Sequence, residues 1–390
     1  MDVDALRRQI PALGRLIYLN TGWAGLSPDG VLRAVGLGLE RERELGRTTA
    51  EALAEREETL DGARRAVARL IGAGGDEICL LENTSEGINT VVNGLDWQPG
   101  DEVVTGTLEH SSVLLPSFFL ARRKDVHVRL AEIGFADSED EIVERFAALL
   151  SPRTRLVMLS HVAYCSGLRL PVGRIARLAH GRGARVLVDG AQSVGQIAVD
   201  VGDLDCDYFA LPGQKWLLGP DGTGALYVRR SLVGELMPGK IAEHAATAFD
   251  FSGRMETVSG MRKFELTTQS AALFAGLTAA IDEHLRRGPE AVEARGRHLA
   301  DALRDRLARV PGMVDYSPPE EVQRTGLVTF GLDGWPAEAL TEALWSRFRI
   351  VARALPFPPA VRYSLACYNT VEEIERAAAA VEELAGEVPG

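Results

Sequence analysis

The chain has 390 residues, a length that suits about two or three structural units with sizeable cores. Hydrophobic residues make up 46% and charged residues 25% of the chain, as in ordinary globular proteins, so a disordered, fibrous or repetitive chain is not expected. The net charge of −12 argues against a nucleic-acid-binding or basic membrane-binding surface and favours a small-molecule partner. Only four of the 43 basic residues are lysines, namely Lys124, Lys215, Lys240 and Lys263.

The four cysteines are widely separated in the sequence: Cys79, Cys165, Cys206 and Cys367. None belongs to a C-x-x-C pair or to a histidine cluster with metal-ligand spacing, so we expect reduced thiols and no metal site. The first ten residues lack the apolar core of an export signal, and no run of about 18 apolar residues occurs. These features predict a cytoplasmic protein.

In chain order, short apolar or β-branched runs alternate with longer amphipathic stretches over the first two thirds of the sequence. The predicted strands are 77–81, 102–105, 127–130, 155–160, 185–188, 208–211 and 225–228, and helical stretches between them include 85–95, 142–150 and 172–180. Strands that alternate with helices predict an α/β fold, in which a mainly parallel sheet is covered on both faces.

The pattern changes after about residue 265. Two helical segments at 269–287 and 289–309 precede strands near 326–330, 350–353 and 361–365, and an Ala-rich and Glu-rich helix closes the chain. We therefore expect a large domain at residues 16–265 and a smaller α+β domain built from residues 1–15 and 266–390.

Polar residues follow two neighbouring predicted strands, where ligands bind in open parallel sheets. Asp189 and Gln192 follow the strand at 185–188, and Lys215 follows the strand at 208–211. Asp189 could simply cap a helix, and a loop lysine is usually a solvated surface charge. However, the apolar run 216–218 beside Lys215 would desolvate its amine and lower its pKa, which favours a Schiff base.

A third polar element opens the predicted helix at 85–95. Thr84 and Ser85 stand at the start of this helix, where free backbone N–H groups and hydroxyls can bind a phosphate. The alternative is an ordinary capping box made by Asn83 and Glu86, which is compatible with phosphate binding. A phosphate site, a strand-end acid and an activated lysine are together what pyridoxal 5′-phosphate (PLP) requires.

The sequence resembles the fold-type I, class V aminotransferase family of PLP-dependent enzymes, which includes cysteine desulfurases, cyst(e)ine C–S lyases and isopenicillin N epimerase-like enzymes. The resemblance extends from Tyr18-Leu-Asn20-Thr-Gly22 to Arg362-Tyr-Ser-Leu-Ala-Cys-Tyr-Asn369. Its most specific part is Asp189-Gly-Ala-Gln192 followed by Lys215. It implies the aspartate aminotransferase-like fold, with a large PLP-binding domain and a smaller C-terminal domain.

The resemblance also implies catalytic roles. Lys215 would form the Schiff base with PLP and carry the Cα proton, and Asp189 would keep the pyridine nitrogen protonated. His110 matches the histidine that stacks on the pyridine ring, although it could also be a structural histidine near a strand end.

Further cofactor contacts follow from the same resemblance. Thr84 and Ser85 match phosphate ligands, and Gln192 would contact the phenolic oxygen of the cofactor. Thr268 matches a threonine that reaches the phosphate across a dimer interface, which implies a homodimer. Tyr164 stands where the family often has an asparagine near the cofactor.

The implied substrate contacts lie at both ends of the chain. Arg362 matches the arginine that binds the substrate α-carboxylate, and Arg353 is a second candidate nearby. Trp23 would lie near the substrate, or would pack in the core instead, and Asn20 beside it is a further candidate.

The sequence departs from the family pattern at several positions. Residues 353–362 contain no cysteine, so desulfuration through an enzyme persulfide is disfavoured. Cys165 and Cys367 are expected to be buried thiols. Pro212 and Gln214 replace the serine and histidine that commonly precede the lysine.

The overall pattern is closest to the C–S lyases and implies α,β-elimination on cysteine, cystine or a cysteine S-conjugate, including a conjugate of secondary metabolism. Three other reactions stay open: decarboxylation with oxidative deamination of an S-cysteinyl conjugate, epimerisation and transamination. A non-catalytic binding protein of the same fold is a further alternative.

Overall fold

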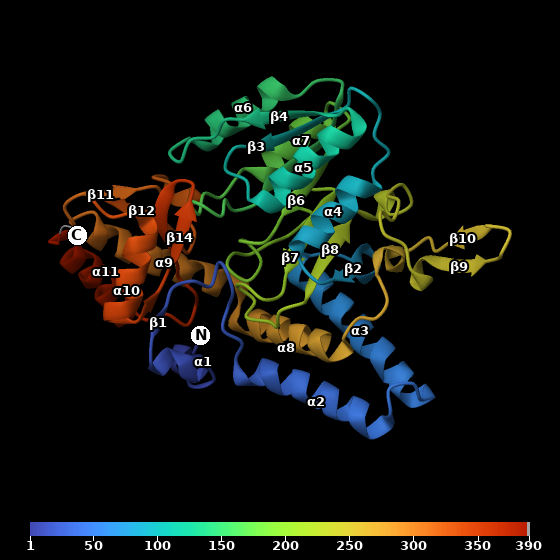
Figure 1. Ribbon diagram of the computed structural model, residues 1–390, viewed down its shortest axis with the longest axis horizontal. Helices are drawn as coiled ribbons and strands as arrows, with labels where there is room; N and C mark the ends of the chain where they lie inside the picture. Colours follow the sequence, from blue (N-terminus) through green and yellow to red (C-terminus); the bar gives the residue numbers. More distant parts are fainter. Residues whose placement is uncertain (388–390) are drawn as a thin grey trace.

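The computed structural model describes residues 1–387, and its largest element is a seven-stranded sheet (Figure 1). The strand order is β2-β8-β7-β6-β5-β3-β4, and all neighbours are parallel except β8, which is antiparallel to β2 and β7. The bounds are β2 Ile78–Leu81, β3 Glu102–Gly106, β4 His127–Ala131, β5 Thr154–Ser160, β6 Arg185–Asp189, β7 Tyr208–Pro212 and β8 Gly224–Val228. The predicted α/β fold with a mainly parallel sheet is confirmed.

Helices cover both faces of this sheet because successive residues of its buried strands point to opposite sides. Along β5, Leu156 and Met158 pack in the cluster that includes the helices α4 (Thr84–Gly94) and α5 (Ser111–Lys124). Val157 and Leu159 pack in the other cluster. That second cluster includes residues of α3 (Ala50–Ile71), α6 (Glu139–Leu149), α7 (Val172–His180) and α8 (Ala271–Arg287).

The C-terminal part forms a second, antiparallel sheet with the order β11-β12-β15-β14. Its strands are β11 Met313–Asp315, β12 Leu327–Leu332, β14 Arg353–Pro356 and β15 Pro359–Ser364. Residues of α9 (Pro289–Leu307), α10 (Ala337–Phe348) and α11 (Val371–Ala385) share one hydrophobic core with this sheet. The smaller α+β unit expected from the sequence is therefore present.

The strand predicted near 350–353 is in fact two strands. The segment predicted as a single strand at 350–353 is split into β13 (Ile350–Val351) and β14, which begins at Arg353. β13 pairs in parallel with β1 (Ile17–Tyr18), whereas β14 pairs with β15. The chain therefore changes its pairing strand at Ala352: β13 pairs with the N-terminal segment, and β14 belongs to the second sheet.

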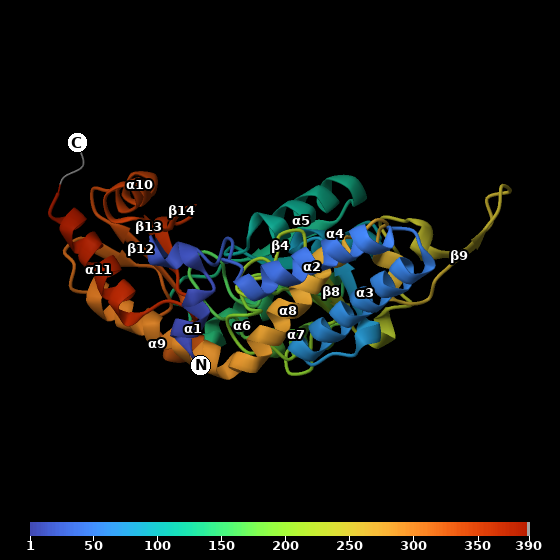
Figure 2. The ribbon, with the colours of Figure 1, turned by 90° about the horizontal axis from the view of Figure 1, so that it is seen from below.

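The N-terminal segment contacts both parts of the chain. It begins with α1 (Val3–Arg8), passes through β1 and continues into α2 (Asp29–Leu45). α8 packs against α2 and α3, as Figure 2 shows. The predicted domain boundaries at 15/16 and 265/266 stay a prediction. Within residues 1–387, no helix combines the length and apolar character needed to cross a membrane.

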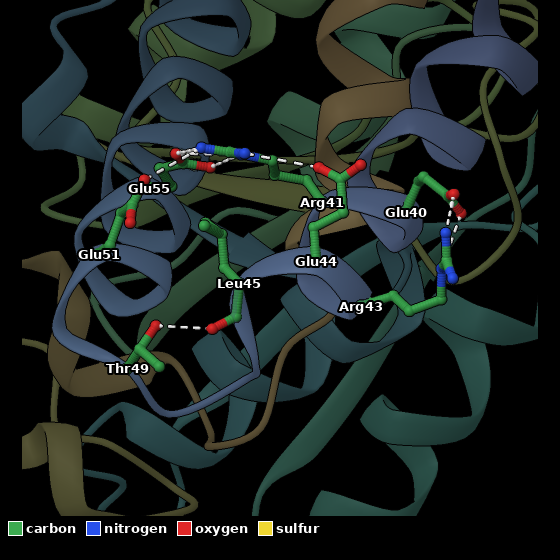
Figure 3. Close-up of polar contacts among 8 residues, drawn as sticks. All are labelled: Glu40, Arg41, Arg43, Glu44, Leu45, Thr49, Glu51 and Glu55. Carbon is green, nitrogen blue, oxygen red and sulfur yellow. Dashed lines mark hydrogen bonds and ion pairs between the residues drawn. The ribbon is translucent and has the colours of Figure 1, made fainter.

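The turn between α2 and α3 is held by charged side chains (Figure 3). Arg41 on α2 contacts Glu55 and Glu51 on α3, with closest distances of 2.8 and 3.1 Å. Thr49 caps α3 by accepting from the backbone N–H of Ala52, and its hydroxyl donates to the carbonyl of Leu45. These contacts lie on the surface, so they fix the geometry of the turn more than they stabilise the fold.

A two-stranded hairpin extends from the end of the molecule opposite α10 and α11 (Figures 1 and 2). It consists of β9 (Ala246–Phe249) and β10 (Met255–Thr257), and exposes Phe249, Phe251 and Met255. Short 3-10 helices complete the fold at Pro11–Gly14, Gly75–Glu77, Arg230–Leu232, Glu243–Ala245, Met261–Phe264 and Glu321–Gln323.

Candidate active site

A cavity of about 390 Å³ lies where β5, β6 and β7 end, and their last residues, Ser160, Asp189 and Pro212, line it. This is the carboxyl edge of the parallel strands, where the sequence predicted the site. The cavity brings together most of the predicted site residues: Trp23, Thr84, Ser85, His110, Tyr164, Asp189, Gln192, Lys215, Arg353 and Arg362.

Two predicted site residues lie outside this cavity. Asn20 is buried beside Ser364 in an isolated bridge, and Thr268 is exposed after the last 3-10 helix before α8. The role predicted for Thr268 belongs to the site of a second subunit, so it stays a prediction, as does the role of Asn20.

Lys215 lies in the loop after β7, and its amine is buried in the cavity wall. The flanking residues Trp216, Leu217 and Leu218 are buried, as their apolar character predicted. Burial lowers the pKa of Lys215 to about 8, against the opposing charge of Asp189. No carboxylate of the described residues lies within ion-pair distance of this amine, so a nucleophilic neutral form is accessible near neutral pH.

Asp189 ends β6 with its carboxylate buried. Its Oδ1 accepts a hydrogen bond of 2.8 Å from the backbone N–H of Ala191. Burial raises the pKa of Asp189, while the charge of Lys215 and this hydrogen bond lower it. A buried acid with room for another donor is suited to a protonated ring nitrogen.

The start of α4 forms the polar end of the cavity. Asn83 caps the helix, because its Oδ1 accepts a hydrogen bond of 2.9 Å from the backbone N–H of Glu86. The Glu86 carboxylate, however, accepts a hydrogen bond from the backbone N–H of Glu82 instead of that of Asn83. Only half of the suggested capping box is therefore formed. The Ser85 hydroxyl lies 2.9 Å from that of Ser112, and the buried Thr84 hydroxyl has no partner among the described residues.

His110 caps α5 from the adjacent wall. Its Nδ1 accepts from the backbone N–H of Ser112 at 3.1 Å, so the ring proton lies on Nε2. Burial lowers the pKa of His110 to about 4, helped by the charges of Lys215, Arg353 and Arg362. The imidazole is therefore neutral at neutral pH, and a neutral ring can stack on an aromatic cofactor.

Arg353 and Arg362 stand opposite each other on β14 and β15. Arg362 is 1% exposed, its Nη1 donates to the carbonyl of Tyr164 at 2.8 Å, and its Nε has no partner in the described chain. Burial lowers the pKa of Arg362 to about 9, and Arg353 contributes to this shift. Neither guanidinium is within 4.0 Å of a carboxylate of residues 1–387, so both can receive a ligand anion.

These features fit PLP. The cavity offers a buried amine, an acid with a free acceptor and a helix N-terminus with an unpaired hydroxyl on Thr84. The buried Oε1 of Gln214 also has no partner among the described residues. Such orphaned polar atoms are costly unless a ligand satisfies them.

The family model for class V aminotransferases matches residues 17–377. The chain belongs to the class V aminotransferase family. It is a PLP-dependent enzyme of this family.

Curated relatives match nearly the whole chain. A probable cysteine desulfurase of Methanothermobacter thermautotrophicus is 33% identical, with 99% of each chain covered. The isopenicillin N epimerase of Streptomyces clavuligerus is also 33% identical, with 83% of this chain and 84% of the epimerase covered.

Solved structures agree with the fold. The cystine C–S lyase C-DES in complex with its reaction product, cysteine persulfide, is 28% identical with a TM-score of 0.90, covering 98% of this class V enzyme and 100% of C-DES. The apo cysteine desulfurase of Thermococcus onnurineus is 26% identical with a TM-score of 0.91, and 98% of each chain is covered.

The amide of Gln192 in this class V enzyme is largely engaged by protein. Its Nε2 donates to the carbonyl of Gly22 at 2.8 Å, and its Oε1 accepts from the indole of Trp216 at 2.9 Å. One N–H of the amide is left for a ligand. The predicted contact with the phenolic oxygen stays a prediction and would use this hydrogen.

The cavity of this enzyme contains no thiol. All four cysteines are buried elsewhere, and none is among the residues that line the cavity. Burial raises the pKa of Cys165 to about 12, so it remains a thiol. Residues 353–362, which contain no cysteine, lie in the tight β14–β15 hairpin.

Glu109 is a residue that the sequence analysis missed, although it precedes His110. Both of its carboxylate oxygens accept from the backbone N–H of Ser160, and Oε2 also accepts 2.5 Å from the Ser160 hydroxyl. Ser160 pairs with Asp189 across β5 and β6. Burial raises the pKa of Glu109 to about 8, against these hydrogen bonds. Glu109 therefore connects the turn before His110 to the strand beside Asp189.

Proposed function

We propose that this enzyme catalyses α,β-elimination on cysteine, cystine or a cysteine S-conjugate. The observation that carries the proposal is the combination of a desolvated lysine with two unpaired guanidiniums in a cavity without a thiol. A persulfide-forming desulfurase requires a thiolate that attacks the substrate sulfur, and no cysteine of this chain lines the cavity. The likeness to the C–S lyase C-DES supports the same choice.

Bound PLP supplies an electron sink for negative charge that develops at Cα. Asp189 would hold the proton on its ring nitrogen, and the start of α4 would bind its phosphate through Thr84, Ser85 and backbone N–H groups. The neutral ring of His110 would cover one face of the pyridine.

The substrate would be bound and deprotonated by residues of the opposite wall. Arg362 would bind the α-carboxylate through two parallel hydrogen bonds, and the neutral amine of Lys215 would take the proton from Cα. The Cβ–S bond would then break, and the sulfur would leave with the bonding electron pair. The balanced reaction converts one S-substituted cysteine and one water into a thiol, pyruvate and ammonia.

A second candidate is epimerisation at Cα, which the likeness to an isopenicillin N epimerase favours. It would use the same deprotonation by Lys215 but return a proton to the other face. Decarboxylation with oxidative deamination and transamination would also begin on this aldehyde cofactor. These reactions release no thiol, so their products distinguish them from elimination.

We also propose a homodimer in which Thr268 of one subunit reaches the phosphate in the other. Thr268 is exposed and does not line the cavity of its own chain, so only a second subunit could bring this residue there. Thr268→Ala should weaken PLP binding without a change in the molar mass of the dimer. A monomer in solution would contradict the proposal.

Product identification tests the main proposal. The holoenzyme is incubated with cystine, cysteine and S-alkyl cysteines, and pyruvate, ammonia and free thiol are measured. Pyruvate in an amount equal to the released sulfur product supports elimination, and this product is sulfide from cysteine, cysteine persulfide from cystine and a thiol from an S-alkyl cysteine. Turnover without pyruvate refutes the proposal. Lys215→Ala should lose activity, while the matched control Lys240→Ala, at an exposed lysine outside the cavity, should keep it.

A further inference from the structure

The turn at residues 20–25 is fastened on both sides of Trp23. The carbonyl of Gly22 accepts from Gln192 at 2.8 Å, and the backbone N–H of Gly25 donates to the carbonyl of Gln214 at 2.7 Å. A Cβ at Gly25 would lie 2.2 Å from the carbonyl oxygen of Lys215, so the turn approaches the lysine loop as closely as glycine allows. The backbone that carries Trp23 is therefore fixed relative to the reacting lysine.

The side chain of Trp23 is nevertheless 60% exposed. It lines the cavity, so the alternative of core packing is wrong. The guanidinium of Arg353 lies 4.3 Å from the ring centroid and covers one face of the indole. No hydrogen bond from the indole N–H to another described residue is formed. A large apolar ring that a fixed backbone carries to the cavity, with most of its surface uncovered, is suited to contact a ligand.

The size of the cavity indicates which part of a substrate reaches Trp23. About 390 Å³ is near the lower end of the range for a site that holds one ligand of ordinary size. Of the residues that line the cavity, Asp189 and Arg362 are buried and Lys215 is half-buried. PLP and the amino-acid part of the substrate would fill the space beside these three residues. A long substituent on the sulfur must therefore extend toward the exposed side, where Trp23 stands.

We infer that Trp23, backed by Arg353, selects cysteine S-conjugates whose sulfur carries a flat aromatic group. Such a group would stack on the uncovered face of the indole, and the cation on its other face would strengthen the stack. A methyl substituent would end before reaching the ring. This inference rests on the proposed elimination function.

The test compares S-benzyl-L-cysteine with S-methyl-L-cysteine. We expect Trp23→Ala to lower the ratio of their kcat/KM values, benzyl over methyl, by about tenfold, and Trp23→Phe to restore most of the ratio. The two leaving groups differ in reactivity, but this difference affects every variant equally and therefore cancels when the ratio is compared between variants. The matched control is Trp345→Ala, which removes another exposed tryptophan that packs under an arginine, Arg349, away from the cavity. This control should leave the ratio unchanged.

A binding measurement separates this inference from the proposed function. The Lys215→Ala variant, loaded with PLP, is titrated with both amino acids, and the visible absorbance of the cofactor reports binding. Tighter binding of the benzyl compound that disappears with Trp23→Ala supports the inference even if the wild type forms no pyruvate. Equal losses for both compounds on Trp23→Ala, in turnover and in binding, would overturn it.

Discussion

Glu109 should make the stability of this protein fall as the pH rises, and Glu109→Gln should abolish that fall. The carboxyl group has an ordinary pKa of 4.5, and burial raises the pKa of Glu109 to about 8 in the folded chain. Between these values the folded chain holds a proton that the unfolded chain has lost, so the free energy of unfolding decreases with pH. A difference of about 3.5 units at about 1.4 kcal/mol per unit corresponds to about 5 kcal/mol.

Glutamine resembles the protonated acid at every pH. Its carbonyl can accept from the backbone N–H of Ser160, as Glu109 does, and its amide can donate to the Ser160 hydroxyl, which itself donates to the carboxylate of Glu109. The variant should therefore match the wild type near about pH 5 and exceed its stability by up to about 5 kcal/mol near about pH 8. The difference should then remain constant at higher pH, because Glu109 is ionised in both states of the wild type.

Urea unfolding of the holoenzyme, followed by tryptophan fluorescence in steps of pH, measures this difference. Glu141→Gln is a useful control, because hydrogen bonds from Ser138 lower the pKa of this exposed acid. Its removal should cost stability as the pH rises, which is the opposite sign. If the difference between wild type and Glu109→Gln is the same at all pH values, Glu109 is ionised throughout, and the hydrogen bonds from Ser160 outweigh its burial.

Two further predictions concern the basic groups of the cavity. The rate at which apoprotein takes up PLP should rise about tenfold per pH unit below about pH 8 and level off above it, because the pKa of Lys215 is lowered to about 8. Stopped-flow absorbance measures this rate. A flat profile between about pH 6 and 9 would contradict the lowered pKa of Lys215. Arg362→Lys should lower kcat/KM by about 10-fold to 100-fold, mainly by raising KM, because an ammonium group cannot make the two parallel hydrogen bonds that a guanidinium makes with a carboxylate. An unchanged KM would show that the α-carboxylate binds elsewhere.

The central sheet and the residues at its edge could be predicted from the sequence. Strands such as β5 and β6 are buried on both faces, so they appear as continuous apolar runs, and their ends are marked by polar residues. Parallel strands end at one edge, which is why Asp189 and Lys215 line one cavity although 26 positions separate them in the sequence. The family resemblance added His110 and Arg362, whose places no periodicity indicates.

Other features depend on tertiary contacts that the sequence does not display. α2 buries only Val31 and approaches α8 through small residues, and a Cβ on Gly38 would lie 2.9 Å from Ala272. A helix that packs in this way has no wide apolar stripe, so its periodicity is weak. The burial of Glu109 could not be predicted for a related reason. An acid beside a histidine is typical of the surface, and only the fold buries this one.

Lysine and arginine have different chemical roles in the proposed site, namely proton release and anion binding. This difference explains why a chain so rich in arginine has a lysine at position 215. In the proposed function Arg353 and Arg362 would hold ligand anions as permanent cations, and even the lowered pKa of Arg362, about 9, leaves it charged at neutral pH. Lys215 must give up its proton to act as a nucleophile and base, and at about pH 7 a pKa of about 8 leaves roughly one tenth of it neutral, about 300-fold more than the ordinary value of 10.5 would. The nearby guanidiniums contribute to that shift, so the groups that would bind the substrate also activate the lysine that would attack it.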